Sequence, residues 1–240
     1  MSTTWLLNDI AEFKGKQELF SRQSLQVLKA LRDSATIQSV ESSNRIEGVT
    51  VGHDRLHALV LGRATPRDRS EQEVHGYRRA LNEIHTGAAS LGVTPDTLLH
   101  LHAHCQSSSG DAGQFKRVGN DIVELRDGRA PIVRFRCVTA AKTPAAVAEL
   151  CRHYRYALDQ DNIPPLIAIA ALALDFLCIH PFRDGNGRVA RLLTLLALNQ
   201  HGYEVGRYLS LERLIEESRE DYYESLYRSS QGGRLSRRRT

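Results

Sequence analysis

HPFRDGNGRVAR, residues 180–191, separates two apolar runs in this chain of 240 residues. The run before it, 166–179, is interrupted by charge only at Asp175, and the run after it reaches residue 198. Both runs suit helices, and the first is too short to cross a bilayer, which needs about twenty residues. We therefore predict two buried helices that are joined by a polar loop.

The loop between these helices is typical of a site that binds phosphate. Gly185, Asn186 and Gly187 come just before the second apolar run and so open its helix. Amide groups at a helix N-terminus are unpaired and carry partial positive charge, which attracts phosphate oxygens. The sequence thus predicts an anion site at the start of this helix.

Side chains with suitable chemistry flank this anion site. The ordinary pKa of His180 suits a general base, and Pro181 after it disfavours helical backbone, so the preceding helix ends there. Asp184 offers the hard carboxylate oxygen that Mg²⁺ prefers. Arg188 and Arg191 lie three residues apart on one helix face and could neutralise phosphate charge.

The stretch resembles the signature of the Fic family, His-x-Phe-x-(Asp/Glu)-Gly-Asn-Gly-Arg-x-x-Arg. The fixed positions are His180, Phe182, Asp184, Gly185, Asn186, Gly187, Arg188 and Arg191. The resemblance implies transfer of AMP from ATP to a hydroxyl side chain of a target protein, with His180 as the catalytic base and Asp184 as the Mg²⁺ ligand. It implies that the phosphates are bound by Gly185, Asn186, Gly187, Arg188 and Arg191. We interpret Phe182 as a core anchor.

A second stretch fits the family's inhibitory pattern, (Ser/Thr)-x-x-x-Glu-(Gly/Asn), through Ser43, Glu47 and Gly48. We predict a helix over 34–47, followed by Gly48 as a left-handed C-cap. Ser43 and Glu47 then share a helix face. The resemblance implies that Glu47 pairs with Arg191, takes the place of the ATP γ-phosphate and inhibits the chain in cis. The alternative is a solvated glutamate at a helix end.

Asp127-Gly128 lies between two β-prone runs within residues 120–135, which predicts a β-hairpin. The resemblance implies a flap over the active site, to which a target protein adds a strand. The alternative is an ordinary ribbon packed on helices. The family builds its base pocket partly after the motif helix, so the resemblance implies Tyr222 or Tyr223 beside adenine. Core packing is the alternative for these two tyrosines.

We expect an all-α fold class, a Fic-like helical bundle with a small β-hairpin flap. The predicted division is an N-terminal helical region that carries the inhibitory helix, 1–60, a Fic catalytic core, 61–232, and a basic tail, 233–240. Cap residues indicate where two of the helices start. They are Ser70, as part of a capping box, and Thr94, which precedes a proline.

The composition favours a cytoplasmic chain and gives little support for nucleic-acid binding. The net charge is +4 at pH 7, and four arginines of the tail alone could supply it. Isolated cysteines without a Cys-x-x-Cys motif suit reduced thiols. The first residues lack the features of a signal peptide, and no run suits a membrane span. A homodimer that buries the inhibitory helix is left open.

His100, His102 and His104 alternate along a predicted helix. Residues two apart point to different faces of a helix, so only His100 and His104 could share a metal ion. We favour surface or core histidines here.

Three alternatives to AMP addition are open from the sequence. Glu47 could position a water that removes AMP from a modified target. Relatives use other phosphate donors, so the same site could transfer phosphate or phosphocholine. In a different class, the core could be a nucleotide-sensing regulatory or interaction module without turnover.

Overall fold

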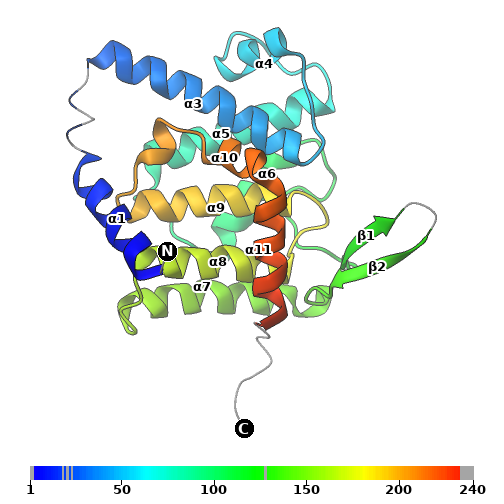
Figure 1. Cartoon of the computed structure of the whole chain (residues 1–240). Coiled ribbons are helices and arrows are strands. Elements are labelled where there is room, and N and C mark those ends of the chain that lie inside the picture. Colours follow the sequence, from blue (N-terminus) through cyan, green and yellow to red (C-terminus); the bar gives the residue numbers. More distant parts are fainter. Residues whose placement is uncertain (1–2, 18, 20–21, 23, 127–128, 233–240) are drawn as a thin grey trace.

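The computed structural model describes residues 3–17, 19, 22, 24–126 and 129–232 as a helical bundle with a two-stranded arm (Figure 1). The helices are α1 (Thr3–Gly15), α3 (Leu25–Ile46), α4 (His53–Val60), α5 (Arg69–Gly87), α6 (Pro95–Cys105), α7 (Thr143–Asp159), α8 (Pro165–Ile179), α9 (Asn186–Gln200), α10 (Leu211–Glu217) and α11 (Arg219–Gly232). The strands are β1 (Ile122–Arg126) and β2 (Arg129–Phe135), and 3₁₀ turns lie at Ala140–Lys142 and Val205–Arg207. The predicted fold class is confirmed. The predicted tail, 233–240, lies outside the described residues.

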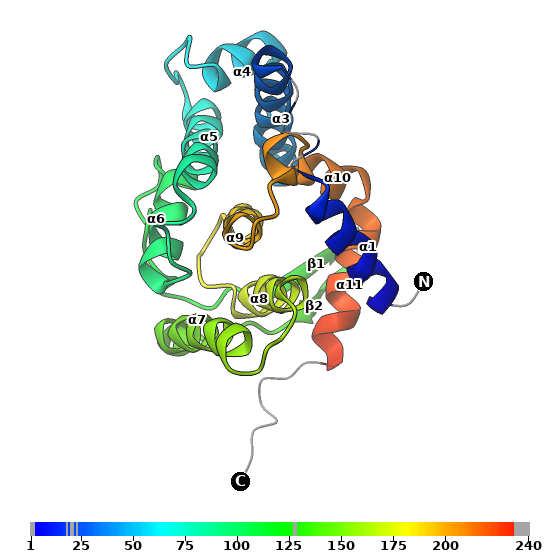
Figure 2. The same ribbon diagram turned by 90° about the vertical axis from the view of Figure 1, so that its left-hand side faces the viewer.

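Helix α9 lies at the centre of the bundle, with α3, α5, α6 and α8 packed around it (Figure 2). Most of its residues between Asn186 and Ala197 are buried, as expected of a helix that is apolar on nearly every side. Helix α8 packs directly along it. The predicted central helix pair is therefore confirmed, and the loop between the two helices has rigid supports.

Helix α3 is longer than the predicted 34–47 and begins at Leu25. Ser24 is its N-cap and accepts a hydrogen bond from the amide of Val27. Leu28 is the only buried residue of α3 before Ala35, and Leu25, Val27 and Leu31 are exposed, so the first turns lack the continuous apolar face that would reveal them in the sequence. The other end agrees with the prediction, since Gly48 follows it with a φ of 79°.

Helix α5 is capped by Asp68, so the predicted capping box at Ser70 is wrong. The Asp68 carboxylate accepts a hydrogen bond from the amide of Glu71 at 2.8 Å. Aspartate caps as well as serine does, and here it comes first along the chain. Glu73, the last residue of the expected box, is buried in the core instead. Thr94 does cap α6, as predicted.

Strands β1 and β2 pair antiparallel and form the arm that leaves the bundle (Figure 1). Val123 pairs with Val133 and Ile122 with Phe135, with an irregularity of register between these pairs. The predicted hairpin is confirmed, and its Asp127-Gly128 turn lies outside the described residues. The predicted division of the chain at residue 60 stays a prediction. Helices α3 and α4, from the N-terminal side of this division, both pack against α5 of the proposed core.

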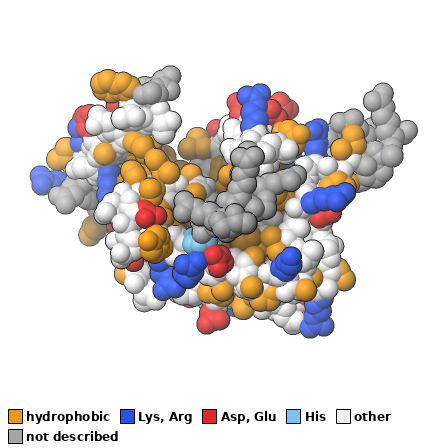
Figure 3. Space-filling view, turned by 90° about the horizontal axis from the view of Figure 1, so that it is seen from below, with side chains coloured by type: hydrophobic (Ala, Val, Ile, Leu, Met, Phe, Trp, Pro, Cys, Tyr) orange, Lys and Arg blue, Asp and Glu red, His pale blue; other side chains and the backbone are white. Residues whose placement is uncertain are grey.

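The surface viewed from below carries basic, acidic and hydrophobic side chains interspersed with one another (Figure 3). In the described part of the chain, no helix combines the length and the apolar character that crossing a bilayer requires.

Candidate functional site

Left-handed backbone begins and ends the loop between α8 and α9. His180, at the C-cap of α8, has φ 52° and ψ 60°, and Gly185, at the N-cap of α9, has φ 79° and ψ 6°. Helix cannot continue easily into Pro181, so the chain turns at His180. Such a conformation is costly for a residue with a Cβ and needs support from its surroundings.

Two side chains that the sequence did not single out give this support. Asn120 Nδ2 donates to the carbonyl oxygens of His180, at 3.3 Å, and Phe182, at 2.6 Å. Lys116 Nζ donates to the carbonyl oxygen of Ile179 at 3.1 Å and to Asn120 Oδ1 at 2.6 Å. Both residues precede the hairpin outside any motif, and only the fold brings them to the loop.

Phe182 and Asn186 lock the middle of the loop. Phe182 is fully buried and stacks on His102 with 3.9 Å between ring centroids, which fits its predicted role as an anchor. The Asn186 side chain accepts from Phe182 N at 2.9 Å and donates to Phe182 O at 2.7 Å. The side-chain amide of Asn186 is therefore already hydrogen-bonded to the Phe182 backbone, and its phosphate contact stays a prediction.

A cavity of about 830 Å³ opens beside this loop. Its wall combines the end of α3, the hairpin, α8, the start of α9 and α11. Sequence-predicted residues on the wall are Glu47, His180, Gly187, Arg191, Tyr222 and Tyr223. This volume is in the range of small-molecule sites. Asp184, Gly185, Asn186 and Arg188 are not part of the wall that the described residues form.

The ion pair between Arg191 and Glu47 is present at the cavity. Arg191 Nη2 lies 2.8 Å from Glu47 Oε1. Arg191 also donates through Nε to Ser43 Oγ at 2.8 Å and through Nη2 to Ser43 O at 2.9 Å. Burial lowers the pKa of Arg191, but the Glu47 carboxylate together with Tyr77 and Tyr222 more than offsets this and leaves the pKa raised. Ser43 and Glu47, which lie on one face of α3, therefore both bind the Arg191 guanidinium.

Glu47 also lies directly on the start of α9. A Cβ atom at Gly187 would collide with Glu47 Oε1, so only glycine leaves room for the carboxylate there. The position is one where helix amides and the helix dipole favour negative charge. The Glu47 carboxylate thus lies beside the start of α9, where the sequence predicts an anion site.

Arg188 makes a different contact and does not reach the cavity. Its side chain is 1% exposed, and Nη1 lies 2.6 Å from Oε2 of Glu73, which is 4% exposed. Weaker contacts at 3.5 Å join the same Nη1 atom to Asn44 and to the carbonyl of Cys105. Arg188 therefore forms an internal ion pair that links α9 to α5, and its phosphate contact stays a prediction.

His180 and Asp184 differ strongly in burial. Burial lowers the pKa of His180, and a hydrogen bond to the Leu177 carbonyl only partly opposes this, so the ring is neutral at pH 7. The Asp184 carboxylate is exposed, accepts from the Gly185 amide at 2.6 Å and lies 3.9 Å from Arg69. A neutral imidazole on the cavity wall can accept a proton, and a single exposed carboxylate suits Mg²⁺ when other oxygens complete its shell.

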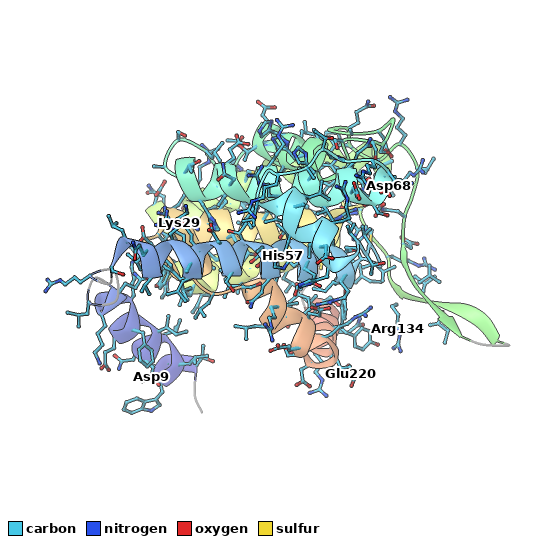
Figure 4. The ribbon with its side chains drawn as sticks, turned by 90° about the horizontal axis from the view of Figure 1, so that it is seen from above. Asp9, Lys29, His57, Asp68, Arg134 and Glu220 are labelled. Carbon is cyan, nitrogen blue, oxygen red and sulfur yellow. The ribbon has the colours of Figure 1, made fainter. Side chains whose placement is uncertain are left out.

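The hairpin and α11 form the outer rim of the cavity. Arg134 of β2 and Glu220 of α11 lie on the same side of the molecule, and both belong to the cavity wall (Figure 4). The Arg134 guanidinium lies 5.3 Å from the ring centroid of Tyr227. Tyr222 and Tyr223 are in edge contact, with 5.6 Å between their ring centroids. Tyr222, Tyr223 and Tyr227 thus give the α11 side of the rim an aromatic surface.

Comparisons with known proteins agree with this arrangement. Residues 92–198 match the Fic/DOC family. The chain is 25% identical over 240 residues to the protein adenylyltransferase Fic of Nematostella vectensis, covering 95% of this chain and 51% of that protein. The chain therefore spans about half the length of this curated relative.

Solved structures share the fold at lower identity. A Fic domain containing signaling protein from Bacteroides thetaiotaomicron superposes with a TM-score of 0.78 at 22% identity, over 95% of this chain and 83% of that one. A Fic family protein from Desulfovibrio desulfuricans gives 0.72 at 23%, over 97% and 68%, and Fic-1 from C. elegans gives 0.72 at 23%, over 96% and 65%. In its motif, its sequence relative and its fold, the chain is similar to proteins of the Fic/DOC family, whose family model matches residues 92–198.

Proposed function

We propose that this chain is a protein adenylyltransferase, which moves AMP from ATP to a hydroxyl side chain of a target protein and of itself. One observation carries the proposal. A neutral imidazole, the amide end of α9 and a guanidinium line a single cavity, through His180, Gly187 and Arg191. The name of the Nematostella vectensis relative supports the same reaction.

The proposed reaction uses His180 as the general base. Its neutral ring accepts the proton of the target hydroxyl, whose oxygen forms a bond to the α-phosphorus of ATP. The bond from this phosphorus to the bridging oxygen breaks, and pyrophosphate leaves. General base catalysis of this kind contributes about a hundredfold to ten-thousandfold. The bracing of the loop by Asn120 and Lys116 keeps the ring in place against the cavity.

The phosphates would lie at the start of α9. Amides near Gly187 and the Arg191 guanidinium provide donors and positive charge for them. Asp184 would hold Mg²⁺, because one carboxylate with nucleotide phosphates is a usual ligand set for this ion. When bound, Mg²⁺ supplies further positive charge to the phosphate oxygens. Tyr222 and Tyr223 offer the aromatic surface on which adenine would stack.

Glu47 acts as an inhibitor in this proposal. Its carboxylate lies against Gly187 and pairs with Arg191, and a terminal phosphate would need these same two contacts. ATP must displace it or bind in a pose that misplaces the α-phosphorus. Weakening the Glu47–Arg191 contact by about 1.4 kcal/mol would raise the open population roughly tenfold while that state is rare.

The target protein would dock on the hairpin at residues 120–135. An exposed strand edge can accept an added strand through backbone hydrogen bonds, which requires little sequence specificity. The side chains of Val123 and Val133 are exposed on the arm, so an apolar contact could accompany the pairing. This placement would bring a target hydroxyl to the cavity rim.

Transfer of label from α-labelled ATP in the presence of Mg²⁺ tests the proposal. We expect weak labelling of the wild-type chain, strong labelling of Glu47→Gly, and none of the double variant Glu47→Gly with His180→Ala. Equal labelling of wild type and Glu47→Gly would reject the inhibitory role.

Further measurements on the same variants distinguish the alternative functions. Mass spectrometry of the product distinguishes AMP from the lighter phosphate and phosphocholine groups. Loss of AMP from a pre-modified target would indicate removal as the main reaction. Calorimetric binding of ATP without any label transfer, in the Glu47→Gly variant as well, would indicate a nucleotide sensor without turnover.

A further inference from the structure

Helices α5 and α6 bring three metal-binding side chains together on the surface. His100 Nε2 lies 2.9 Å from Glu83 Oε2, and His104 Nε2 lies 3.3 Å from the same oxygen. The two rings are in edge contact with 4.6 Å between their centroids. One ligand atom from each residue fits within 4.8 Å of the others. Both histidines thus direct the same ring nitrogen at one carboxylate.

This donor set has the chemistry of a zinc-type site. Tetrahedral Zn²⁺ accepts imidazole nitrogen and carboxylate oxygen at roughly 2.0–2.2 Å, so neighbouring ligand atoms lie about 3.4 Å apart. The observed separations are close to this spacing before any ion is added. Mg²⁺ and Ca²⁺ prefer oxygen ligands and would compete poorly.

We propose that Glu83, His100 and His104 form a binding site for one divalent transition-metal ion of the zinc class. Two histidines four residues apart on α6 supply one face, and Glu83 adds the third ligand from α5. Three protein ligands leave a coordination position for water. Arg79, one turn before Glu83 on α5, is the cation whose charge acts on His104 and opposes binding.

The proposed ion would connect the two helices that hold the loop of the candidate site. Helix α5 carries Glu73, which binds Arg188, and α6 carries His102, whose Nε2 contacts the Asp184 carbonyl at 3.1 Å. Glu83, His100 and His104 do not belong to the cavity wall formed by the described residues. The ion is thus expected to stabilise the scaffold without touching the nucleotide.

A second histidine pair provides an internal control. His53 and His57 on α4 have the same spacing, and their rings are 4.3 Å apart (Figure 4 labels His57). In the described part of the chain, the only grouping of three close metal ligands is the one around Glu83. A paired-histidine effect should therefore appear at both places, and a three-ligand site only at Glu83.

Calorimetric titration of the chelator-treated whole chain with Zn²⁺, in excess Mg²⁺, tests the proposal. We expect one Zn²⁺ per chain, with binding weakened roughly tenfold or more in Glu83→Gln and His100→Ala. His57→Ala should match the wild type. Zn²⁺ should also raise the thermal midpoint of the wild type, and this rise should disappear in His100→Ala.

Each outcome decides the matter. Unchanged affinity in Glu83→Gln and His100→Ala, weaker binding in His57→Ala, or no Zn²⁺ binding by the wild type would overturn the proposed site. His100 is exposed, so its loss should leave the metal-free fold intact. Circular dichroism of the metal-free variants checks this. The measurement needs no nucleotide, and its result is independent of the proposed AMP transfer.

Discussion

Arg188 and Arg191 lie one turn apart on the same helix, yet they belong to two different regions. Both guanidiniums are buried, at 1% and 4% exposure, and each pairs with a glutamate. The partner of Arg188, Glu73, is also buried at 4%, whereas the partner of Arg191, Glu47, is 25% exposed and lies on the cavity wall. Burial of the arginine is therefore the same in both pairs, and they differ in the exposure of the glutamate. Under the proposed function, only the pair with the exposed glutamate is displaced by ATP.

When the glutamate partner of each arginine is replaced by glutamine, the unfolding free energy should fall most at the Arg188 pair. Glu73→Gln leaves a charged guanidinium in the core without a counter-charge, which costs about 3–5 kcal/mol of unfolding free energy. Denaturant unfolding followed by circular dichroism measures this. A loss below about 1 kcal/mol would mean that the two pairs are equivalent in the fold.

Glu47→Gln should affect activity more than stability. It removes the negative charge from the start of α9 while keeping a side chain of similar shape. We expect the unfolding free energy to fall by about 3 kcal/mol or less. Label transfer should rise roughly tenfold for each 1.4 kcal/mol by which the inhibited state is weakened. Label transfer at the wild-type rate, with normal ATP binding, would remove Glu47 from the mechanism.

The pH dependence should report the cavity region through His180. Burial places the pKa of His180 below its ordinary value of 6.5. The base must be neutral, so label transfer by Glu47→Gly should still exceed half of its high-pH value at pH 6.5 and reach half only at lower pH. A pH–rate profile measures this. Half-maximal transfer at or above pH 6.5 would contradict the assigned base or its buried environment.

The smallest effect is expected at the outer edge of the Arg188 region. Arg69 is 67% exposed and lies 2.8 Å from Glu73 on the side opposite the core. Arg69→Ala should change the unfolding free energy by only about 0–1 kcal/mol, because solvent screens an exposed ion pair. Denaturant unfolding beside Glu73→Gln provides the comparison. Equal losses in the two variants would show that Glu73 depends on its surface partner.

Local patterns predicted the parts of this site that are formed by short stretches of chain. Gly185 before α9, the proline after His180 and Gly48 after α3 mark backbone turns, and each turn lies where the sequence predicts it. The apolar run that follows Gly187 predicted the buried helix because its length and composition leave few alternatives. The hairpin followed from its alternating β-prone residues in the same way.

Contacts between distant polar residues were not predictable from local patterns, and the Glu47–Arg191 pair was expected only because the family resemblance implied it. Glu73 fitted a capping box, since an acidic residue near a helix start has the same local signature whether it caps or faces inward. The contacts of Asn120 and Lys116 with the His180 loop join residues about sixty positions apart, and no periodic pattern encodes them. The ion pair of Arg188 was not predicted for the same reason, because its partner Glu73 lies on another helix.

The most direct test of the shared anion site is a crystal structure of Glu47→Gly with ATP and Mg²⁺. We expect the terminal phosphates at the Gly187 amide and the Arg191 guanidinium, with the α-phosphorus facing His180, while Arg188 still binds Glu73. Phosphates bound elsewhere in the cavity, or an Arg191 that contacts only Ser43 beside bound ATP, would contradict the proposal that Glu47 and ATP compete for one position.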